Sequence, residues 1–316
     1  MIKSNIQRKR RRKKYLFPKI ALLSLVLFIL YSFLPFGSAT QENPPNRTFS
    51  TIGQSSNDQY PILSENPPSN LANFPAFSLP LPVTELTDTR YLELVNRTFS
   101  MQDPTPSYRL VLAWPDMAVR ATDILLHETA FSAIHALYQA AGRAGITNLF
   151  IASGYRSMDE QRELYENATN RSYVMPAGHS EHQLGLAADI LASGRYHTGG
   201  MRGSTEARWL AENAAEFGLI LRYPSHKQDI TEVAYEPWHF RYVGRIHAFV
   251  MGQHDFVLEE YIQFLQEIDG YQTTFESKTY YILYQRAENG ILWVPEHLEF
   301  NLSRTNTGGY IITAWR

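Results

Sequence analysis

The spacing of apolar side chains divides the middle of the chain into helical stripes and short buried runs. In segments 123–141 and 204–217 apolar residues recur every three or four positions, which predicts two amphipathic helices. The apolar runs at 149–152 and 186–191 are uninterrupted and short, which is typical of buried strands. The chain therefore has a globular part that begins near Tyr91 and contains both helices and strands.

Further along the chain the pattern predicts three more elements and then changes. Strands are expected at 219–223 and 238–243, followed by a closing helix at 256–268. We expect the tail after Gly270 to form a small β-rich unit or to add strands to the main sheet. Its apolar runs are separated by Asn-Gly and Gly-Gly turns and lie at 279–284, 291–294 and 309–314.

The N-terminal region combines a dense basic cluster with an apolar segment. Segment 20–36 is a run of 17 residues without a charged side chain, and residues 1–14 carry eight Lys and Arg and no acid. A membrane-spanning helix needs roughly 17–25 apolar residues, and positive charge before it keeps the N-terminus in the cytoplasm. We predict a single-pass membrane anchor that places the rest of the chain outside the cytoplasm. The alternative is a signal peptide cleaved near Ala39, which would release a secreted protein.

The composition changes again at residue 40. Segment 40–85 is rich in Pro, Asn and Ser and poor in aliphatic residues, which indicates a flexible linker. Four regions are therefore expected in the chain. They are a basic tip with the anchor or signal peptide at 1–39, the linker at 40–85, the main domain at 86–269 and a β-rich subdomain at 270–316.

Charge and cysteine content exclude several kinds of site. From Thr40 onward the chain holds 20 Lys and Arg against 31 Asp and Glu, a net charge of −11. An acidic body of this kind does not favour binding to nucleic acid, whose phosphates attract basic surfaces. The chain has no cysteine, so disulfides, thiolate metal sites and a cysteine nucleophile are excluded. Any metal ion has to be bound by nitrogen and oxygen atoms.

Arg156 stands in a predicted turn between a strand and a helix. The strand at 149–152 ends at a Ser-Gly pair, and Ser157 with Glu160 forms a capping-box pattern that opens a helix to about residue 168. A guanidinium at this end does not favour the helix dipole, which prefers negative charge there. The position therefore indicates a role beyond local stability. An ordinary surface salt bridge is the alternative.

Three side chains have the types and the spacing of a catalytic metal site. His182 and Asp189 are seven residues apart, and His239 follows 50 residues after Asp189. Two close ligands and one distant ligand are usual for a three-ligand zinc site, in which water takes the fourth position. His179 lies three residues before His182 and is a rival ligand that the spacing does not exclude.

Glu236 and Arg156 would complete the chemistry of such a site. Zinc lowers the pKa of its bound water toward about 7. Glu236 lies three residues before His239, and peptide hydrolysis needs a carboxylate that accepts a proton from this water and passes it to the leaving amine. Arg156 would stabilise negative charge on the carbonyl oxygen or bind a substrate carboxylate.

Two longer motifs resemble those of the VanY-type zinc D-alanyl-D-alanine carboxypeptidases, in the lysostaphin/D-Ala-D-Ala/hedgehog superfamily. Residues 180–189, Ser-Glu-His-Gln-Leu-Gly-Leu-Ala-Ala-Asp, fit the signature Ser-x-His-x-x-Gly-x-Ala-x-Asp. Residues 236–239, Glu-Pro-Trp-His, fit the signature Glu-x-x-His. Residues 153–157 with Gln161 are similar to the family's arginine-bearing turn. The resemblance covers roughly residues 90–265.

This resemblance implies a fold and a set of residue roles. The implied fold is α+β, with a small antiparallel sheet that carries a zinc site and helices packed around it. The implied substrate-pocket residues are Ser180, Trp238 and Gln161, although Trp238 is equally suited to the core. The other implied roles are Zn²⁺ ligands for His182, Asp189 and His239, general base for Glu236, and transition-state stabilisation for Arg156.

The activity implied by the resemblance is removal of the terminal D-alanine from peptidoglycan stem peptides. The enzyme would be a zinc-dependent D,D-carboxypeptidase in which Glu236 activates a zinc-bound water. A D,D-dipeptidase or a peptidoglycan endopeptidase of the same superfamily is the nearest alternative. A metal-bound recognition module without catalysis is an alternative from another class, and the presence of both Glu236 and Arg156 argues against it. The motifs carry no information on oligomeric state.

Overall fold

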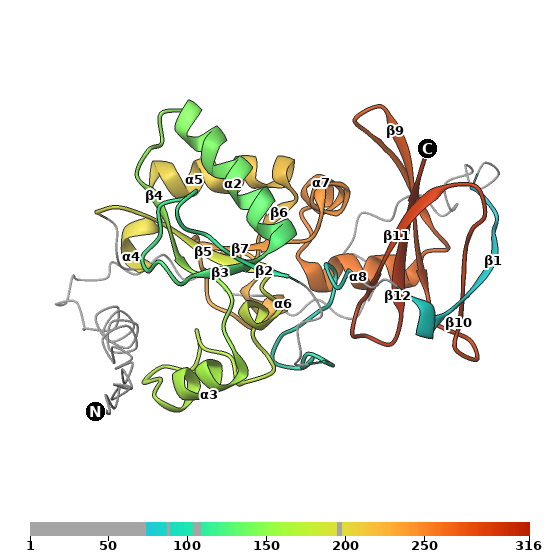
Figure 1. Ribbon diagram of the computed structural model, residues 1–316, viewed down its shortest axis with the longest axis horizontal. Coiled ribbons are helices and arrows are strands. Elements are labelled where there is room, and N and C mark those ends of the chain that lie inside the picture. The colour runs from blue at the N-terminus through green and yellow to red at the C-terminus, as the bar shows by residue number, and fades with distance from the viewer. Residues whose placement is uncertain (1–73, 87–88, 104–108, 195–197) are drawn as a thin grey trace, which may run out of the picture.

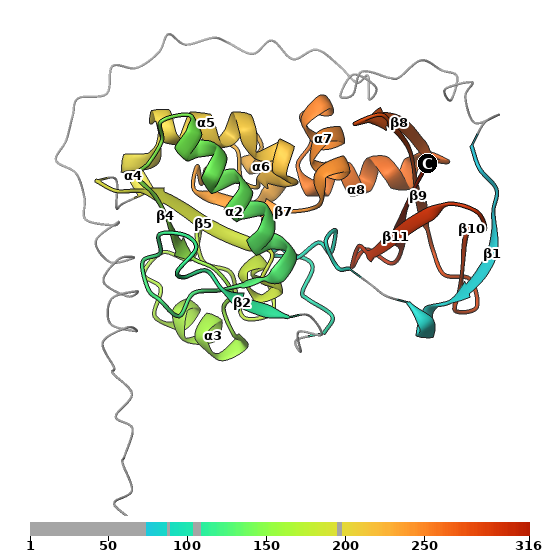
Figure 2. The same cartoon turned by 45° about the horizontal axis from the view of Figure 1, so that its top comes forward.

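The computed structural model describes residues 74–86, 89–103, 109–194 and 198–316. Its larger part is built on a four-stranded antiparallel sheet, and its smaller part contains the C-terminal strands. The two parts lie side by side, with the helices α7 (Arg245–His254) and α8 (Leu258–Glu267) between them (Figure 1). A view turned by 45° shows the same arrangement (Figure 2).

The main sheet contains the four strands that the apolar runs predicted. They are arranged in the order β4-β5-β7-β6, and every neighbouring pair is antiparallel. The two inner strands β5 and β7 therefore have a hydrogen-bonded neighbour on each side, so their backbone polar groups are paired although the sheet is buried. The strand bounds are β4 Leu149–Ser153, β5 Ala187–Ala192, β6 Leu219–Leu221 and β7 His239–Tyr242.

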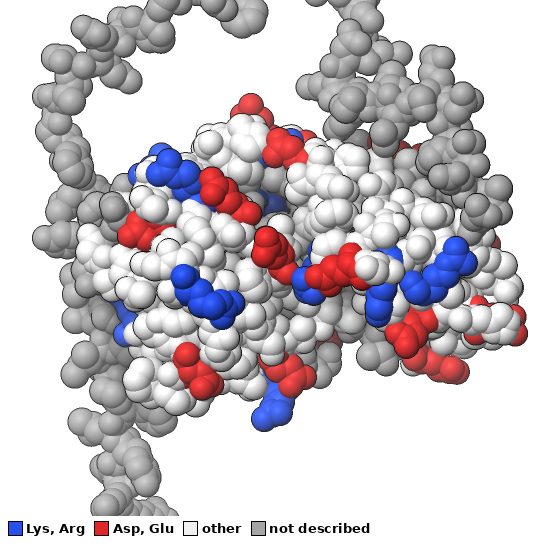
Figure 3. All heavy atoms as spheres, turned by 90° about the horizontal axis from the view of Figure 1, so that it is seen from above, with Lys and Arg blue, Asp and Glu red and all other residues white. Residues whose placement is uncertain are grey.

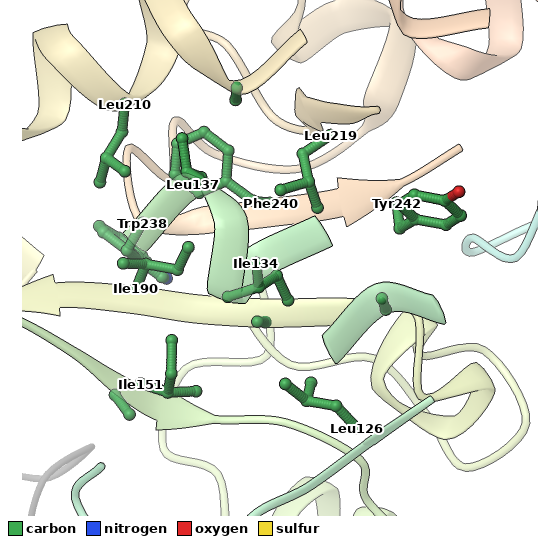
Figure 4. Close-up of a cluster of buried hydrophobic side chains, with 14 of the residues drawn as sticks. Leu126, Ile134, Leu137, Ile151, Ile190, Leu210, Leu219, Trp238, Phe240 and Tyr242 are labelled. Carbon is green, nitrogen blue, oxygen red and sulfur yellow. The ribbon is translucent and has the colours of Figure 1, made fainter. Parts of the chain in front are cut away.

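One face of this sheet forms the main hydrophobic core. Helices α2 (Glu128–Arg143) and α5 (Thr205–Asn213) cover it, and a 3₁₀ helix (Ala214–Phe217) continues α5. Leu137 and Leu210 from these helices lie over Phe240 of β7 and belong to one buried cluster with it (Figure 4). Full burial of a side chain of this size contributes roughly 1.5–3 kcal/mol. The helical stripes predicted from the sequence are the faces that pack here.

The arginine-bearing turn leads from β4 to α3 (Met158–Glu166), which lies on the side of the sheet away from α2 and α5. The predicted capping box is confirmed. The backbone N–H of Ser157 donates to Glu160 Oε2 at 2.8 Å, and the backbone N–H of Glu160 donates to Ser157 Oγ at 3.3 Å. These bonds satisfy N–H groups that the first turn of a helix leaves without partners.

The C-terminal strands form a sheet of their own rather than extending the main sheet. Its order is β11-β12-β9-β8, and α8 packs against it through apolar residues such as Ile262 and Leu265, which share a buried cluster with Ile282 of β9. The β-rich character predicted for this region is therefore confirmed. The strand bounds of this sheet are β8 Tyr271–Phe275, β9 Lys278–Gln285, β11 Glu299–Arg304 and β12 Tyr310–Trp315, while β10 (Ile291–Pro295) belongs to a separate two-stranded sheet.

The prediction that the linker runs to residue 85 is wrong at its C-terminal end. Residues Phe77–Pro82 form β1, which pairs antiparallel with β10 of the C-terminal part, and Val83–Glu85 follow as a 3₁₀ turn. Prolines at positions 80 and 82 made this segment resemble a linker, but an edge strand tolerates proline because one side of its backbone has no partner. A fragment that keeps the pairing of β1 with β10 therefore has to begin before residue 77.

Other elements differ from prediction because tertiary contacts override the local pattern. The helix expected at 123–141 begins only at Glu128, since Leu125–His127 form the strand β3, which pairs with β2 (Leu110–Leu112). Helix α7 was not predicted, because buried residues surround much of it and leave no clear apolar stripe. Two short helices complete the described elements, α4 (Thr198–Met201) and α6 (Gln228–Thr231).

The predicted membrane anchor or signal peptide at 1–39 and most of the linker lie outside the described residues. Within the part that the structure describes, no helix combines the length and the apolar composition that crossing a membrane requires. The N-terminal segment, its cleavage and the location of the protein therefore remain predictions.

Acidic and basic side chains are intermixed on the surface seen from above. On this face red and blue side chains alternate, and no basic stripe crosses it (Figure 3). Such a surface lacks, on the side in view, the continuous positive potential that attracts nucleic acid phosphates. The absence of nucleic acid binding stays a prediction from the charge balance.

His247 joins the two parts of the molecule and is expected to make their packing sensitive to acid. It is buried on α7, where its ring nitrogens contact the Tyr261 hydroxyl at 2.8 Å and Thr313 Oγ1 of β12 at 3.2 Å. Burial lowers the pKa of His247 to about 3.

Between pH 6.5 and 3 the unfolded chain would therefore bind a proton at His247 that the folded chain does not bind. Stability from this residue is present above pH 6.5 and should fall by about 1.4 kcal/mol per pH unit below it. Urea unfolding from pH 7 to pH 4 would test this, with His247→Gln as the reference. The stability advantage of the natural protein should shrink as the pH falls, and a constant difference would contradict the prediction.

Candidate active site

A single row of polar residues crosses the face of the main sheet opposite the core. The strand register places Ser153 of β4 opposite Asp189 of β5, and Asp189 opposite His239 of β7. Beyond β7, the backbone N–H of Arg222 donates to the His239 carbonyl at 3.1 Å. Side chains of paired residues in neighbouring strands point to the same face. The pairing of three strands therefore brings together residues up to 86 positions apart, as the numbers 153 and 239 show.

A β-bulge in β4 determines which residue of that strand joins this row. The register of β4 against β5 shifts between Ile151 and Ser153, so that Ala152 is the extra residue. Without the bulge Ala152 would stand opposite Asp189, because pairing before the shift runs residue for residue. Bulges beside active sites commonly redirect a side chain in this way. Here the bulge brings Ser153 and the following turn next to the site.

His182 is presented by a short 3₁₀ helix, Glu181–Leu184, just before β5. The Gln183 side chain fixes the loop that leads into this helix, because Gln183 Oε1 accepts from the backbone N–H of Gly178 at 2.7 Å. Gly185 ends the helix with φ +67°, a left-handed conformation that favours glycine. The signature Ser-x-His-x-x-Gly thus describes one turn of helix, with its glycine stop, that directs His182 toward β5.

The three predicted metal ligands lie close together. One side-chain donor atom from each of His182, Asp189 and His239 lies within 4.8 Å of the others. His182 Nε2 is 3.5 Å from Asp189 Oδ2, and His239 Nδ1 is 3.1 Å from Asp189 Oδ1. Donor atoms of a tetrahedral zinc ion at about 2.1 Å are separated by about 3.4 Å. The donor set and its spacing therefore fit a zinc ion.

The other nitrogen of each imidazole has an acceptor as its partner. Nδ1–H of His182 donates to the backbone carbonyl of Gly154 at 2.7 Å. Nε2–H of His239 donates to Glu181 Oε2 at 3.3 Å. Each bond places a hydrogen on the nitrogen that faces away from Asp189, so that the nitrogen facing Asp189 is the one that would bind a cation after losing any proton it carries.

Burial and mutual charge shift the pKa values of these ligands. Burial alone would raise the pKa of Asp189, but the two histidines outweigh burial and hold it well below its usual range. Burial lowers the pKa of His182. For His239 burial also acts downward, but hydrogen bonds to Asp189 and Glu181 raise its pKa to about 9. A metal ion would have to displace a proton from this group.

Glu236 lies beside the ligand cluster without belonging to it. Its Oε2 is 3.8 Å from His239 Nδ1, and the residue is buried. Burial, assisted by the negative charge of Asp189, raises the pKa of Glu236 to about 8, although His239 and Arg156 act in the opposite direction. A divalent cation in the cluster would lower this pKa, because an opposite charge favours the carboxylate. The group is therefore suited to exchange a proton near neutral pH.

Two side-chain hydrogen bonds orient the Arg156 guanidinium. Its Nη1 donates to Gln161 Oε1 at 2.6 Å and its Nη2 donates to Ser153 Oγ at 3.1 Å, while its backbone N–H donates to the His182 carbonyl. These bonds use one N–H of each terminal nitrogen, so the second N–H of each remains for a substrate. Gly154 beside it has to be glycine, since a Cβ there would collide with the backbone carbonyl of Leu125.

All of the predicted site residues line one cavity of about 310 Å³. Trp238 is shared between two environments, because it lines this cavity and also packs in the core next to Ile190 (Figure 4). The rival ligand His179 is not among the cavity residues, and its Nδ1 contacts the Asn96 carbonyl at 2.7 Å instead. The predicted residues in the cavity wall are Arg156, Gln161, Ser180, His182, Asp189, Glu236, Trp238 and His239. Their individual roles stay predictions.

Sequence reasoning missed Glu181, the buried carboxylate that contacts His239. The charges of Arg222 and Arg241 and the bond to His239 overcome the effect of burial and hold the pKa of Glu181 below its usual range. A signal for it was present. Each arginine interrupts an apolar strand sequence, Leu-Ile-Leu-Arg-Tyr and His-Phe-Arg-Tyr, and a buried arginine needs a buried acid.

An imidazole–carboxylate–imidazole cluster on a small antiparallel sheet, with a separate carboxylate and an arginine in the same cavity, defines a metallohydrolase type of site. The model of the VanY family, D-alanyl-D-alanine carboxypeptidase, matches residues 123–245. The D-alanyl-D-alanine carboxypeptidase of Enterococcus faecium is 39% identical over 176 residues, which are 55% of this chain and 56% of that protein. The chain thus spans little more than half the length of this relative.

Two further proteins match over nearly their whole length. The bifunctional D-Ala-D-Ala dipeptidase and D-Ala-D-Ala carboxypeptidase VanXYC of Enterococcus gallinarum is 33% identical over 187 residues, 56% of this chain and 95% of that protein. The crystal structure of the vancomycin resistance D,D-dipeptidase VanXYg, in complex with a D-Ala-D-Ala phosphinate analogue, superposes with a TM-score of 0.65 at 28% identity. That superposition covers 75% of this chain and 98% of that one.

The chain belongs to the VanY family of D-alanyl-D-alanine carboxypeptidases. This confirms the family resemblance and the α+β fold predicted from the sequence motifs.

Proposed function

We propose that this protein is a zinc-dependent D,D-carboxypeptidase that removes the terminal D-alanine from peptidoglycan stem peptides. The observation that carries the proposal is the gathering of His182, Asp189 and His239 within 4.8 Å in the same cavity as Glu236 and Arg156. Membership of the VanY family supports the choice of substrate.

The proposed reaction is hydrolysis of the last peptide bond. His182, Asp189 and His239 would hold zinc, which supplies a Lewis acid that polarises a carbonyl and lowers the pKa of water. Glu236 accepts a proton from the attacking water while the water oxygen forms a bond to the carbonyl carbon. The carbon–nitrogen bond then breaks, and Glu236 returns the proton to the leaving D-alanine nitrogen.

Arg156 would act on the oxygen of the same carbonyl. Its guanidinium is held by Gln161 and Ser153, so its free N–H groups are oriented before substrate binds. Preorganised donors of this kind stabilise negative charge in the transition state without a cost of reorganisation at that moment. The Gln161 side chain is itself held in place, because its Nε2 donates to the Met175 carbonyl at 2.5 Å.

Incubation of the purified protein with a pentapeptide ending in D-Ala-D-Ala tests the proposal. We expect release of free D-alanine, loss of release after chelation with EDTA, and recovery on addition of zinc. Matched peptides ending in L-Ala-L-Ala serve as the control for stereochemistry. If no stem peptide released D-alanine under any metal condition, the assignment would be overturned.

A second candidate function is cleavage of the free dipeptide D-Ala-D-Ala. Two matching proteins favour it, since VanXYC carries both activities in its name and VanXYg is described as a dipeptidase. The assay above separates the two activities when the free dipeptide is supplied alongside the pentapeptide. Cleavage of the dipeptide alone would replace the carboxypeptidase assignment, and cleavage of both would make the protein bifunctional.

A further inference from the structure

Glu181 is a buried carboxylate in the wall of the site cavity, at the centre of a cluster of charged residues. Its side chain has 0% exposure, and it is the residue next to the predicted ligand His182. One oxygen, Oε2, accepts from Nε2–H of His239 at 3.3 Å. The other, Oε1, accepts from Nε–H of Arg222 at 2.7 Å and lies 2.9 Å from Nη1 of Arg241. The two oxygens of the Glu181 carboxylate therefore have different partners: Oε2 contacts His239, and Oε1 contacts the two arginines.

The cluster continues away from the site to helix α8. Both terminal nitrogens of Arg222 donate to Glu259, at 2.8 and 2.6 Å, which makes a two-pronged contact. Glu259 Oε1 also accepts from Asn96 Nδ2 at 3.1 Å. The Asn96 carbonyl contacts His179 Nδ1 at 2.7 Å, so the chain of contacts returns to the loop that precedes the 3₁₀ helix of Glu181.

We propose that Glu181 is a positioning residue for the ligand His239, and that Glu259 supports it through Arg222. The inference rests on the metal site of the proposed function, but it does not depend on which peptide is cleaved. Glu181 dictates which nitrogen of His239 keeps its hydrogen when a metal ion binds. Because a carboxylate can only accept, Nε2 has to donate to Glu181, which leaves Nδ1, 3.1 Å from Asp189 Oδ1, as the nitrogen that would lose its proton and bind the metal ion.

The two arginines prevent Glu181 from turning away. Arg222 and Arg241 are both fully buried, and both contact Oε1. A carboxylate held on one oxygen by two cations presents the other oxygen in a fixed direction, and that direction is His239. Arg241 is fixed in turn by bonds from its Nη2 to the backbone carbonyls of Tyr91 and Glu93 at 3.1 Å.

This arrangement makes glutamine an informative substitution. Glutamine has the same shape, but only one of its two terminal atoms accepts a hydrogen bond. Two arginines would take the amide oxygen, which turns the NH₂ group toward His239 Nε2. His239 would then have to accept at Nε2 and carry hydrogen at Nδ1, the atom that faces Asp189. The substitution would thus select the tautomer that cannot bind a metal ion in this cluster.

Zinc affinity of the purified full chain, measured by competition with a chromogenic chelator, tests the proposal without any peptidase assay. Glu181→Gln is expected to weaken zinc binding about 10–100-fold. Glu259→Gln, which leaves Glu181 in place but frees Arg222, should weaken it by a smaller factor. The matched control is Glu260→Gln on the same helix, where a buried glutamate pairs with Lys227 at 3.0 Å and does not contact the cluster. That control should leave zinc affinity unchanged.

Thermal unfolding of each variant, with and without zinc, separates positioning from general stability. A purely structural role predicts that Glu181→Gln and Glu259→Gln lower the unfolding temperature while zinc affinity stays at the level of the control, and this result would overturn the inference. If Glu181→Gln does not fold, Glu259→Gln alone decides, by the same comparison with Glu260→Gln. If the unaltered protein bound no zinc, the proposed function would fall together with this inference. Normal zinc binding in all variants would remove the inference alone.

Discussion

Replacement of Glu236 by glutamine is expected to lower kcat for D-alanine release by about 10²–10⁴-fold. The amide fills the same space beside His239 but does not accept a proton at neutral pH, so the attacking water would lose its base. Glu236 lies 3.8 Å from His239 Nδ1 and is not one of the three clustered donors. Steady-state kinetics with the pentapeptide substrate measure the effect.

The same variant should keep its fold and its metal. Burial raises the pKa of Glu236 to about 8, which means that the surroundings already favour the neutral form of this side chain. A neutral amide is therefore tolerated at this position, in contrast to the loss of a buried carboxylate that neutralises arginines. Zinc content and unfolding temperature close to those of the natural protein would be the controls. A variant that retained kcat within a few-fold would exclude Glu236 as the base.

The residues of the candidate site could be predicted because their motifs are local structures. Ser-x-His-x-x-Gly is one turn of 3₁₀ helix with a left-handed glycine stop at Gly185. Ser157 and Glu160 form the capping box that starts α3, so the position of Arg156 in the turn before it followed from the sequence. Each of these features depends on residues less than six positions apart, which is the range that sequence patterns describe well.

The residues that support the site are a different case, since they depend on pairing between distant segments. Glu181 occupies a position that the family signature leaves open. Its partners Arg222 and Arg241, and Glu259 that contacts Arg222, lie 41 to 78 residues further along the chain. Neither charge nor spacing connects them until the strands are paired. Two arginines within apolar strand sequences did indicate a missing acid, but they could not say which one.

The boundaries of the two parts show the same limit of local reasoning. β1 follows a Pro-rich segment and was assigned to the linker, yet it pairs with β10, which lies more than 200 residues later in the chain. Its residues are exposed or half-buried, and although Phe77, Leu79 and Leu81 alternate along it, the prolines at positions 80 and 82 are typical of a linker. α7 was missed for the opposite reason, because apolar residues are distributed around most of its circumference. Both β1 and α7 therefore depend on contacts with distant parts of the chain, which a local sequence pattern does not show.

Replacement of Arg156 by glutamine is the second change expected to have a large effect, a decrease of kcat by about 10²–10³-fold. Glutamine retains one N–H donor group but loses the positive charge that would face the carbonyl oxygen as its negative charge develops. KM should change much less than kcat, because a group that acts on the transition state contributes little to ground-state binding. Kinetics with the D-Ala-D-Ala pentapeptide resolve the two constants.

The division between kcat and KM also decides which role Arg156 plays. If it binds the terminal carboxylate of the substrate instead, KM should rise with a smaller change in kcat, since that carboxylate is present before and during the reaction. Arg162→Gln is the matched control, because Arg162 lies on α3, the helix that follows the turn of Arg156, is exposed and pairs with Asp159 at 2.5 Å. The control should leave both constants unchanged.

Arg156→Lys then tests the anchoring itself. Lysine keeps the charge, but a single ammonium group cannot reproduce the paired contacts to Gln161 Oε1 and Ser153 Oγ that fix the direction of the guanidinium. We therefore expect lysine to recover only part of the activity lost with glutamine. Full recovery would mean that charge alone suffices and that the hydrogen bonds from Arg156 to Gln161 and Ser153 do not contribute to catalysis.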